Sequence, residues 1–411
     1  MTQQWFRTAG LTLFAAAIAS TAANADGADG RSLAASYNAS GHDLLKQFIA
    51  APGNVVFSPY SIGSAMAMVL SGAKGGTATQ MASVLHQGLD RDRMDAANAD
   101  VLSILKNYGK PAAIARPSSL GIANALMLAP GAVTSDAYVK RLKQEYAAEV
   151  FHNAGLDEIN AWVKRTTQGK IDRILDQPVR KGIVLIDAVY FKQAWRAPFF
   201  PRDTENDDFH LSPNSTIKVA TMHQRGYFPV VSRPGYRAIR LPYLTGSLSM
   251  VVILPDAVEG ATALAQQLDS SELAELFVML RLEDVYTDLS LPRFKTGFAA
   301  KLKSRYQQLG LMRPFDEDRA DFSGITGRPR EQVRVWIDDI VHRVALEVAE
   351  EGVEAAAASA TSLVEITSAG RREPSLAEPF TVDRPFLFYV SDDKTGAILF
   401  AGRISDPSQT N

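Results

Sequence analysis

The side chains that most often do chemistry are sparse in this sequence. The chain has six histidines, at positions 42, 86, 152, 210, 223 and 342. No two of them lie four residues apart, so the sequence has no His-Glu-x-x-His zinc motif. There is no cysteine, which excludes a thiolate nucleophile, a cysteine-based metal site and a disulfide. We therefore expect no metal and no cofactor.

Hydrolase and nucleotide-binding motifs are missing as well. The sequence has no Gly-x-Ser-x-Gly motif, and residues 72–77 (GAKGGT) lack the spacing of a phosphate-binding loop, so we expect a turn between helices there. The acid pairs at 207–208 and 338–339 are expected on solvated loops or strand edges, because adjacent side chains on a strand point apart. A Ser/His/Asp triad built from distant residues stays open, because a triad is recognised by geometry and not by order.

The composition indicates a globular protein with a sizeable core. Of the 411 residues 46% are hydrophobic and 21% are charged, and the formal net charge is −2. Without a basic field we expect neither nucleic acid nor an anionic membrane as a partner.

The first 25 residues read as a signal peptide. Arg7 precedes an apolar run at 9–19, and the small-residue sequence Ala-Asn-Ala follows at 23–25. An uncleaved membrane anchor is the alternative, but the run is about half of the ~20 residues that span a bilayer. We expect a mature chain of residues 26–411 that is exported, either periplasmic or extracellular.

Helices and strands are interleaved along the mature chain. Short runs rich in β-branched residues predict buried strands at 182–191, 248–254 and 397–401. Helical spacing of apolar residues is found at 32–49, after Ser58 and Pro59, and at 157–168, 262–282 and 299–309. Because the order has no strict βαβ period and no linker divides the chain, we expect one α+β domain.

The segment from about 350 to 379 departs from this composition. Residues 350–362 (EEGVEAAAASATS) contain almost no bulky side chain. They could form a helix end or a flexible linker, because alanine has the highest helix propensity. As a strand they present one uncharged face of small side chains from Val353 to Leu363, which could enter a packed sheet without clashes.

This segment resembles the hinge of the reactive-centre loop of inhibitory serpins. The hinge residues are Glu350, Glu351, Gly352, Val353, Glu354, Ala355, Ala356, Ala357 and Ala358. Further serpin-like signatures occur in order at 54–62, 72–80, 159–171, 187–195, 291–295, 309–311, 320–325, 342–348, 384–388 and 398–403. Together they cover nearly all of residues 32–407. A threonine or serine is commoner at the position of Val353, but valine is small and uncharged, so we expect insertion to survive.

The resemblance implies a fold and a function. The fold would have a large central mixed β-sheet, further sheets, about eight to nine helices and an exposed loop. The protein would be a bacterial suicide-substrate inhibitor of serine endopeptidases, with cysteine endopeptidases as a further class. It would be a monomer and not an enzyme. A serpin-fold binding protein or protease substrate that does not inhibit is the alternative, and a secreted hydrolase with a dispersed triad is a competitor of a different class.

The resemblance also places the bond that a protease would cut. In inhibitory serpins it usually follows the residue 14 positions beyond the hinge glycine, which places it here between Ile366 and Thr367. An isoleucine bait favours elastase-like or subtilisin-like proteases, because a trypsin-type pocket carries a carboxylate that isoleucine leaves unpaired. Pro385 lies 19 positions after Ile366, a longer separation than is common in the family, so Arg371 and Arg372 remain an alternative bait for trypsin-like enzymes.

Other residues match mechanical parts of the serpin fold. The shutter beneath the central sheet comprises Ser58, Ser61, Asp187 and His342, and Asp187 stands where an asparagine is usual. A charged Asp187–His342 contact would make sheet opening sensitive to pH; a neutral histidine bonded to the backbone is the alternative.

At the breach, where the loop first enters the sheet, the matching residues are Trp195 and Glu350. Arg293 is the expected partner of Glu350. We expect a surface ion pair that gates insertion and adds little stability.

Overall fold

The computed structural model describes residues 9–108, 119–350 and 376–410, with side chains from residue 27 onward. Its α-helices are α1 (Ala9–Phe48), α2 (Pro59–Gly72), α3 (Gly75–Val84), α4 (Arg91–Tyr108), α5 (Asp136–Glu145), α6 (Leu156–Thr166), α7 (Gly260–Gln267), α8 (Ser270–Met279), α9 (Lys303–Gln308) and α10 (Ser323–Thr326). Two 3₁₀ helices are η1 (Pro201–Asp203) and η2 (Arg313–Phe315). The described residues therefore contain ten α-helices, slightly more than the eight to nine expected.

The strands are β1 (Val55–Phe57), β2 (Ser119–Leu128), β3 (Glu149–His152), β4 (Ile183–Lys192), β5 (Glu205–Ser212), β6 (Ser215–Arg233), β7 (Tyr236–Pro242), β8 (Leu248–Pro255), β9 (Asp284–Pro292), β10 (Phe294–Lys301), β11 (Ile337–Val348), β12 (Glu378–Thr381), β13 (Phe386–Asp392) and β14 (Ile398–Ile404). All three runs predicted to be strands are confirmed, as β4, β8 and β14.

Five strands form the central sheet, in the order β10-β11-β4-β2-β3. Its two middle neighbours, β4 and β11, run parallel, and β4 is buried along nearly all of its length. The sheet is mixed, because β10 and β2 run antiparallel to these middle strands. We call the β4–β11 boundary the seam.

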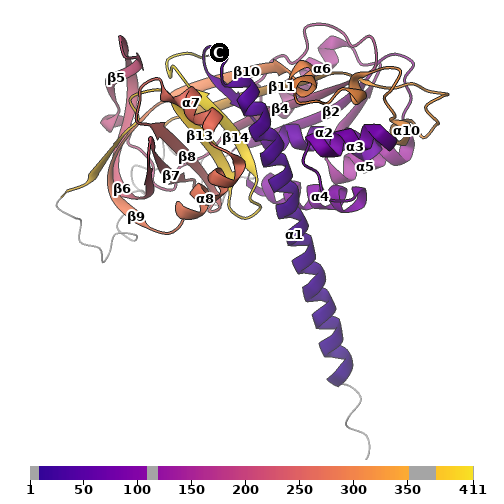
Figure 1. Ribbon diagram of the computed structural model, residues 1–411, viewed down its shortest axis with the longest axis horizontal. Helices are drawn as coiled ribbons and strands as arrows, with labels where there is room; N and C mark the ends of the chain where they lie inside the picture. Colours follow the sequence, from indigo (N-terminus) through magenta and orange to yellow (C-terminus); the bar gives the residue numbers. More distant parts are fainter. Residues whose placement is uncertain (1–8, 109–118, 351–375, 411) are drawn as a thin grey trace, which may run out of the picture.

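The other strands make a second, nine-stranded sheet, in the order β1-β14-β13-β8-β7-β6-β9-β12 with β5 paired to β6. The 19-residue strand β6 pairs with β9 and β5 over its first part and with β7 at its end. Figure 1 shows the β5–β6–β9 region at one end of the molecule and the central sheet with α6 at the other.

Helix α2 is buried along its whole length and packs against both β4 and β14. It begins where the sequence predicted, because the Ser58 hydroxyl accepts a hydrogen bond from the Ser61 N–H and Pro59 occupies the first turn. No helix among the described residues is long and apolar enough to cross a membrane.

Two predicted helices differ from those observed. The pattern at 262–282 is divided between α7 and α8, because Asp269 caps a new helix with hydrogen bonds from Ser271 N and Glu272 N. The pattern at 299–309 is helical only from Lys303, and its first residues continue β10. Tertiary pairing with β11 overrides the local helical spacing there. Of the turn predicted at 72–77, only residues 73–74 lie between α2 and α3, because α3 already begins at Gly75.

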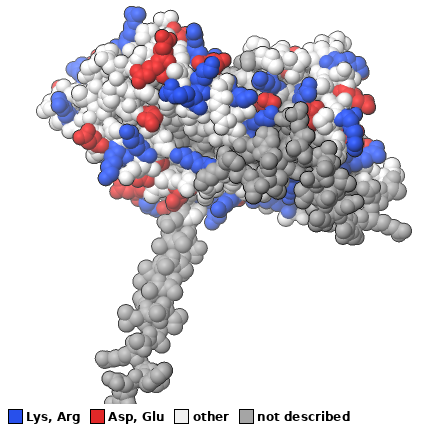
Figure 2. Space-filling model, turned by 180° about the vertical axis from the view of Figure 1, so that it is seen from behind, with Lys and Arg blue, Asp and Glu red and all other residues white. Residues whose placement is uncertain are grey.

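Charges of both signs are mixed over the face of the molecule in Figure 2, where no large area of one sign is visible. This distribution agrees with the mixed charges of the sequence.

Candidate functional site

A buried polar network ties the lower part of the seam together. Asp187 on β4 lies beside His342 on β11, and the parallel register pairs the two residues. His342 Nδ1 contacts Asp187 Oδ1, and the Ser61 hydroxyl from α2 contacts Asp187 Oδ2. The Ser58 N–H donates to His342 Nε2 at 3.2 Å. The four predicted shutter residues are thus in contact, and none is more than 2% exposed.

These contacts fix the protonation of the histidine. A backbone N–H can only donate, so His342 Nε2 must accept and carries no hydrogen. The hydrogen is therefore on Nδ1, which donates to Asp187. Of the two alternatives left by the sequence, the geometry favours the neutral histidine bonded to the backbone over the charged pair.

The same contacts argue that this Ser/His/Asp set is not a catalytic triad. In a triad the serine hydroxyl bonds the imidazole, and the carboxylate bonds the opposite ring nitrogen. Here the Ser61 hydroxyl bonds the carboxylate of Asp187, and the far nitrogen of His342 is occupied by the backbone of Ser58. Ser61, Asp187 and His342 are each 0% exposed, so a substrate has no access to them.

Asn124 is a member of the network that sequence reasoning missed. It lies on β2 opposite Asp187 in the β2–β4 register, and its Oδ1 is 3.5 Å from the Ser61 hydroxyl. Its side chain is 4% exposed. No local pattern marks this asparagine, because the strand pairing alone places it beside Ser61.

A second set of contacts closes the upper end of the seam. The Trp195 indole N–H donates to Ala349 O at 2.9 Å, and its ring stacks on Tyr243 with centroids 4.4 Å apart. Glu350 Oε1 accepts a hydrogen bond from the Thr204 hydroxyl at 2.8 Å and lies 3.5 Å from an Arg293 guanidinium nitrogen. These contacts therefore hold the chain directly after the end of β11.

The expectation of a surface ion pair at this end is corrected in one respect. The Arg293 side chain is 53% exposed, but that of Glu350 is only 8% exposed. Burial makes Glu350 dependent on its partners, because an unpaired buried carboxylate is costly. Thr204, which has no sequence signal for this role, supplies the shorter of the two contacts.

Helix α6 covers the outer face of the central sheet (Figure 1). The layer beneath it contains several small side chains: Ala123, Ala125 and Ala188, with Ala345 at its edge. A Cβ on Gly121 would lie 3.0 Å from Thr166 O at the end of α6, so helix and sheet are in close contact. Helix α6 therefore packs closely on β2, the strand next to β4.

Several predicted site residues lie outside the described residues. They are the hinge from Glu351 to Ala358, the bait residues Ile366 and Thr367, and the alternative bait Arg371 and Arg372. The described structure stops at Glu350, two residues after β11, and resumes at Leu376, just before β12.

The comparisons with known proteins identify the family. A family model described as serpin, or serine protease inhibitor, matches residues 35–407. The chain belongs to the serpin family. Serpins are mostly inhibitors and not catalysts.

Relatives and solved structures agree with this membership. An uncharacterised serpin-like protein of Thermococcus kodakarensis is 35% identical over 89% of this serpin and 83% of the relative. Leukocyte elastase inhibitor A of Mus musculus is 35% identical over 86% of this serpin and 93% of the relative. The native stressed conformation of an Arabidopsis serpin superposes with a TM-score of 0.80 at 25% identity, covering 92% of this serpin and 99% of that chain. Uncleaved ovalbumin gives 0.78 at 28% identity, with coverage of 92% and 100%.

Proposed function

We propose that this serpin is a suicide-substrate inhibitor of serine endopeptidases, with cysteine endopeptidases as a further class. The observation that carries the proposal is the parallel pair β4 and β11 at the centre of the sheet. The segment that follows Glu350 leaves the upper end of β11. If it turned back between the two strands, it would run antiparallel to both and could pair with each.

The chemistry of trapping is an interrupted peptide hydrolysis. The hydroxyl oxygen of the protease serine attacks the carbonyl carbon of Ile366, and the bond to Thr367 breaks. The nitrogen of Thr367 takes a proton and leaves as a new amino terminus, while residue 366 remains as an ester on the protease. From residue 352 to 366 an inserted strand would extend ~46 Å at ~3.3 Å per residue, enough to carry the protease along the sheet before water cleaves the ester.

The target class follows from the bait. Ile366 favours elastase-like or subtilisin-like enzymes, and two relatives at 34–35% identity are named leukocyte elastase inhibitors. The pair Arg371–Arg372 would direct the protein to trypsin-like enzymes instead. With residues 1–25 as a cleaved signal peptide, the inhibitor would act in the periplasm or outside the cell.

Gel electrophoresis with mass spectrometry tests this proposal. The chain from residue 26 is mixed with an elastase-like or a trypsin-like protease, and the products are separated under denaturing conditions. We expect a covalent complex with the elastase-like enzyme and a released fragment that begins at Thr367. A complex whose fragment begins at Arg372 or Glu373 would move the bait to the arginine pair. Cleavage without a complex by every protease tested would overturn the proposal.

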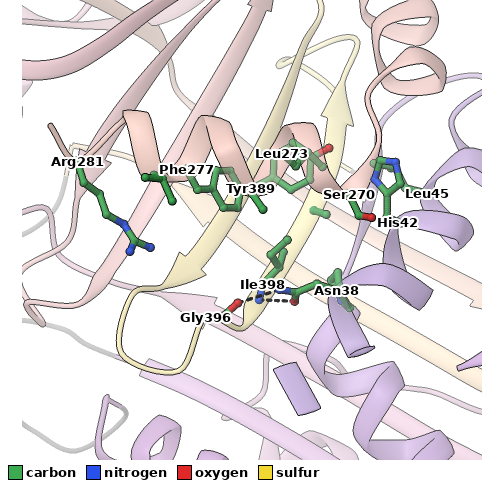
Figure 3. Close-up of a pocket in the computed structure, with 14 residues that line it drawn as sticks. Asn38, His42, Leu45, Ser270, Leu273, Phe277, Arg281, Tyr389, Gly396 and Ile398 are labelled. Atoms are coloured by element: carbon green, nitrogen blue, oxygen red, sulfur yellow. Dashed lines mark hydrogen bonds between the residues drawn. The ribbon is translucent and has the colours of Figure 1, made fainter. Parts of the chain in front are cut away.

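A small-molecule carrier is a second candidate, because this serpin has a mostly apolar pocket between α1, α8 and strands β13 and β14 (Figure 3). The pocket has a volume of about 190 Å³ and contains two buried polar atoms without a hydrogen-bond partner, His42 Nδ1 and Tyr389 Oη. His42 Nε2 bonds Leu268 O at 2.8 Å and must donate there, so Nδ1 is an acceptor.

Ligand binding distinguishes the carrier from the inhibitor. A ring compound with one donor and one acceptor would satisfy His42 and Tyr389. Calorimetry measures the binding of phenolic compounds to wild type and to His42→Phe. Saturable binding that is lost in His42→Phe would favour the carrier, provided that the wild-type chain forms no covalent complex with any protease. Covalent trapping with no such binding would exclude it as the main function.

A further inference from the structure

A buried carboxylate lies at the junction of three helices, away from the seam. Asp95 on α4 is 4% exposed. The hydroxyl of Tyr146, which caps α5, donates to Asp95 Oδ1 at 2.5 Å, and Arg141 Nε of α5 lies 3.3 Å from Asp95 Oδ2. Asp95 therefore links α4 to α5.

A neighbouring amide extends this link to α1. Asn98 lies one turn beyond Asp95 on α4, so both project from the same face. The Tyr37 hydroxyl of α1 donates to Asn98 Oδ1 at 3.1 Å, and Asn98 Nδ2 donates to Glu145 O at the end of α5 at 2.8 Å. Helices α1, α4 and α5 are thus joined by one polar cluster.

The surroundings of Asp95 disfavour its charge. Burial raises the pKa of Asp95 to about 6, although the Tyr146 hydrogen bond and Arg141 act in the opposite direction. Titratable or charged side chains of four helices surround Asp95. They are Tyr37 of α1, Tyr60 of α2 (beyond Tyr37), Arg91 of α4, and Tyr138, Arg141, Glu145 and Tyr146 of α5 and its cap. Arg141 is the nearest cation, and its side chain is 35% exposed.

The cluster lies where the molecule must shear if the seam opens. Helix α5 packs on β3, the edge strand of the β4–β2–β3 half of the central sheet. Helix α1 packs on β14 of the second sheet, and α2 packs on β14 as well as on β4 and β2. Helix α4 contacts α1, α2 and α5, and it also contacts β2. Moving β4 away from β11 would draw α5 along with β3. Helix α4 touches β2 but has more extensive contact with α1 and α2, so α5 would move against α4 and α1.

We propose that Asp95 is a proton-controlled latch between α4 and α5 that sets how readily the seam opens. This inference rests on the proposed function and adds a control to it. With Asp95 protonated no carboxylate charge is buried between the helices, and the closed arrangement is favoured. With Asp95 ionised, the carboxylate gains hydration when α5 slides, so opening becomes easier.

The direction in which pH changes the stability of the closed form follows from the linkage between proton binding and opening. The closed form binds the proton more tightly than an opened form, in which Asp95 would return toward its ordinary pKa of 3.8. Ionisation therefore weakens the closed form as pH rises through about 6, and this contribution to stability is fully present only below about pH 4. Each pKa unit that is regained on opening corresponds to about a tenfold change in the opening equilibrium.

The first test compares Asp95→Asn with Asp92→Asn, an exposed acid on the same helix, by urea unfolding from pH 4.5 to 8. The asparagine at 95 imitates the protonated acid. We expect the difference between the two unfolding midpoints to grow as pH rises to about 6 and then to level off, with its half-point near pH 5, about midway between the ordinary and the raised pKa of Asp95. A difference that stays constant over this range would overturn the latch.

A second variant distinguishes a change in the titration of Asp95 from a general loss of stability. Tyr146→Phe removes a hydrogen bond that stabilises the ionised form of Asp95, so it should move the half-point of the wild-type pH profile upward. General destabilisation would lower every midpoint without moving that half-point. An unmoved half-point in a folded Tyr146→Phe chain counts against the proposal.

The trapping assay tests the link to the seam at one pH. At pH 7.5 Asp95→Asn should insert its loop more slowly, so a larger share of it should be cleaved without trapping the protease, while Asp92→Asn should match wild type. Equal shares in all three chains would overturn the link. If the urea profile behaves as expected but wild type traps no protease, the latch stands as a control of stability and the proposed inhibitory function fails.

Discussion

Asp187 is a buried carboxylate held by two neutral donors, the Ser61 hydroxyl and His342 Nδ1–H. Because the side chain is fully buried, both donors would be left without an acceptor if it were removed. An amide in its place could still accept from His342, and Asn124 Oδ1 offers Ser61 another acceptor. The serine, histidine and acid positions therefore act as one hydrogen-bonded unit across the seam.

Asp187→Ala should lower the free energy of unfolding by ~2–6 kcal/mol, because two buried donors each lose a partner at ~1–3 kcal/mol. Asp187→Asn is the matched control and should change it by no more than about 1.5 kcal/mol. Urea midpoints at pH 7 measure both. Equal losses in the two variants would mean that the acceptor atoms are not what matters at this position.

Glu350→Lys should promote spontaneous loop insertion or polymerisation. The change places a cation in a site that is 6% exposed, removes the acceptor of the Thr204 hydroxyl and faces Arg293 with a like charge. We expect the free energy of unfolding to fall by ~3–5 kcal/mol, as it does for other buried charges that are left unpaired. Size-exclusion chromatography after mild heating should show oligomers for this variant and a monomer for Glu350→Gln, which keeps an acceptor for Thr204. A purely monomeric Glu350→Lys would contradict the assigned role.

At the scale of elements, the seam is the boundary that would open in the proposed insertion. Val189 on β4 and Val344 on β11 are register partners, and each is 1% exposed. Because the chain has no cysteine, a disulfide engineered between these two positions would be its only one. Neighbouring strands usually bring such pairs within the Cα separation of ~4.4–6.8 Å that a disulfide needs.

Val189→Cys/Val344→Cys should stop trapping when oxidised and recover it when reduced, because a crosslinked seam cannot accept a strand. The oxidised protein should be cleaved as an ordinary substrate, whereas each single-cysteine chain should trap normally under both conditions. The gel assay for the covalent complex measures this. Undiminished trapping by the fully oxidised double variant would show that insertion does not pass through this seam.

At the scale of the whole molecule, the five-stranded central sheet leaves room for a gain in stability. An inserted strand would add ladder hydrogen bonds to both β4 and β11, each worth a net ~0.5–1.5 kcal/mol. The intact protein would then be the less stable of two arrangements of the same chain, kept apart by the contacts of the shutter and the breach.

Cleavage within residues 350–379 should therefore raise the melting temperature, by about 10 °C or more if ten or so new hydrogen bonds form. Scanning calorimetry of the intact and the nicked protein measures this. A nicked protein that melts at or below the temperature of the intact chain would indicate a serpin fold without insertion, as in the non-inhibitory alternative.

Much of the fold could be predicted from the sequence, because short patterns record local constraints. The β-branched runs that became β4, β8 and β14 were visible in this way, and so was the Ser58–Pro59 start of α2. Helix and strand bounds failed where a distant partner decided them, as at residues 299–301, which pair with β11 although their spacing is helical.

The sequence by itself determined the family, the small-residue composition of residues 350–362 and the positions of Ser58, Asp187, Trp195, His342 and Glu350, because ordered motifs over most of the chain carry this information. Only the tertiary structure decided which atoms meet. It added Asn124 and Thr204 and showed that His342 Nε2 accepts from the Ser58 N–H. It also showed that Glu350 is buried and that Asp95 of α4 meets Tyr146 at the end of α5. The physical reason is that hydrogen-bond partners and desolvation depend on strand register and helix packing between residues far apart in the chain, which local spacing does not encode.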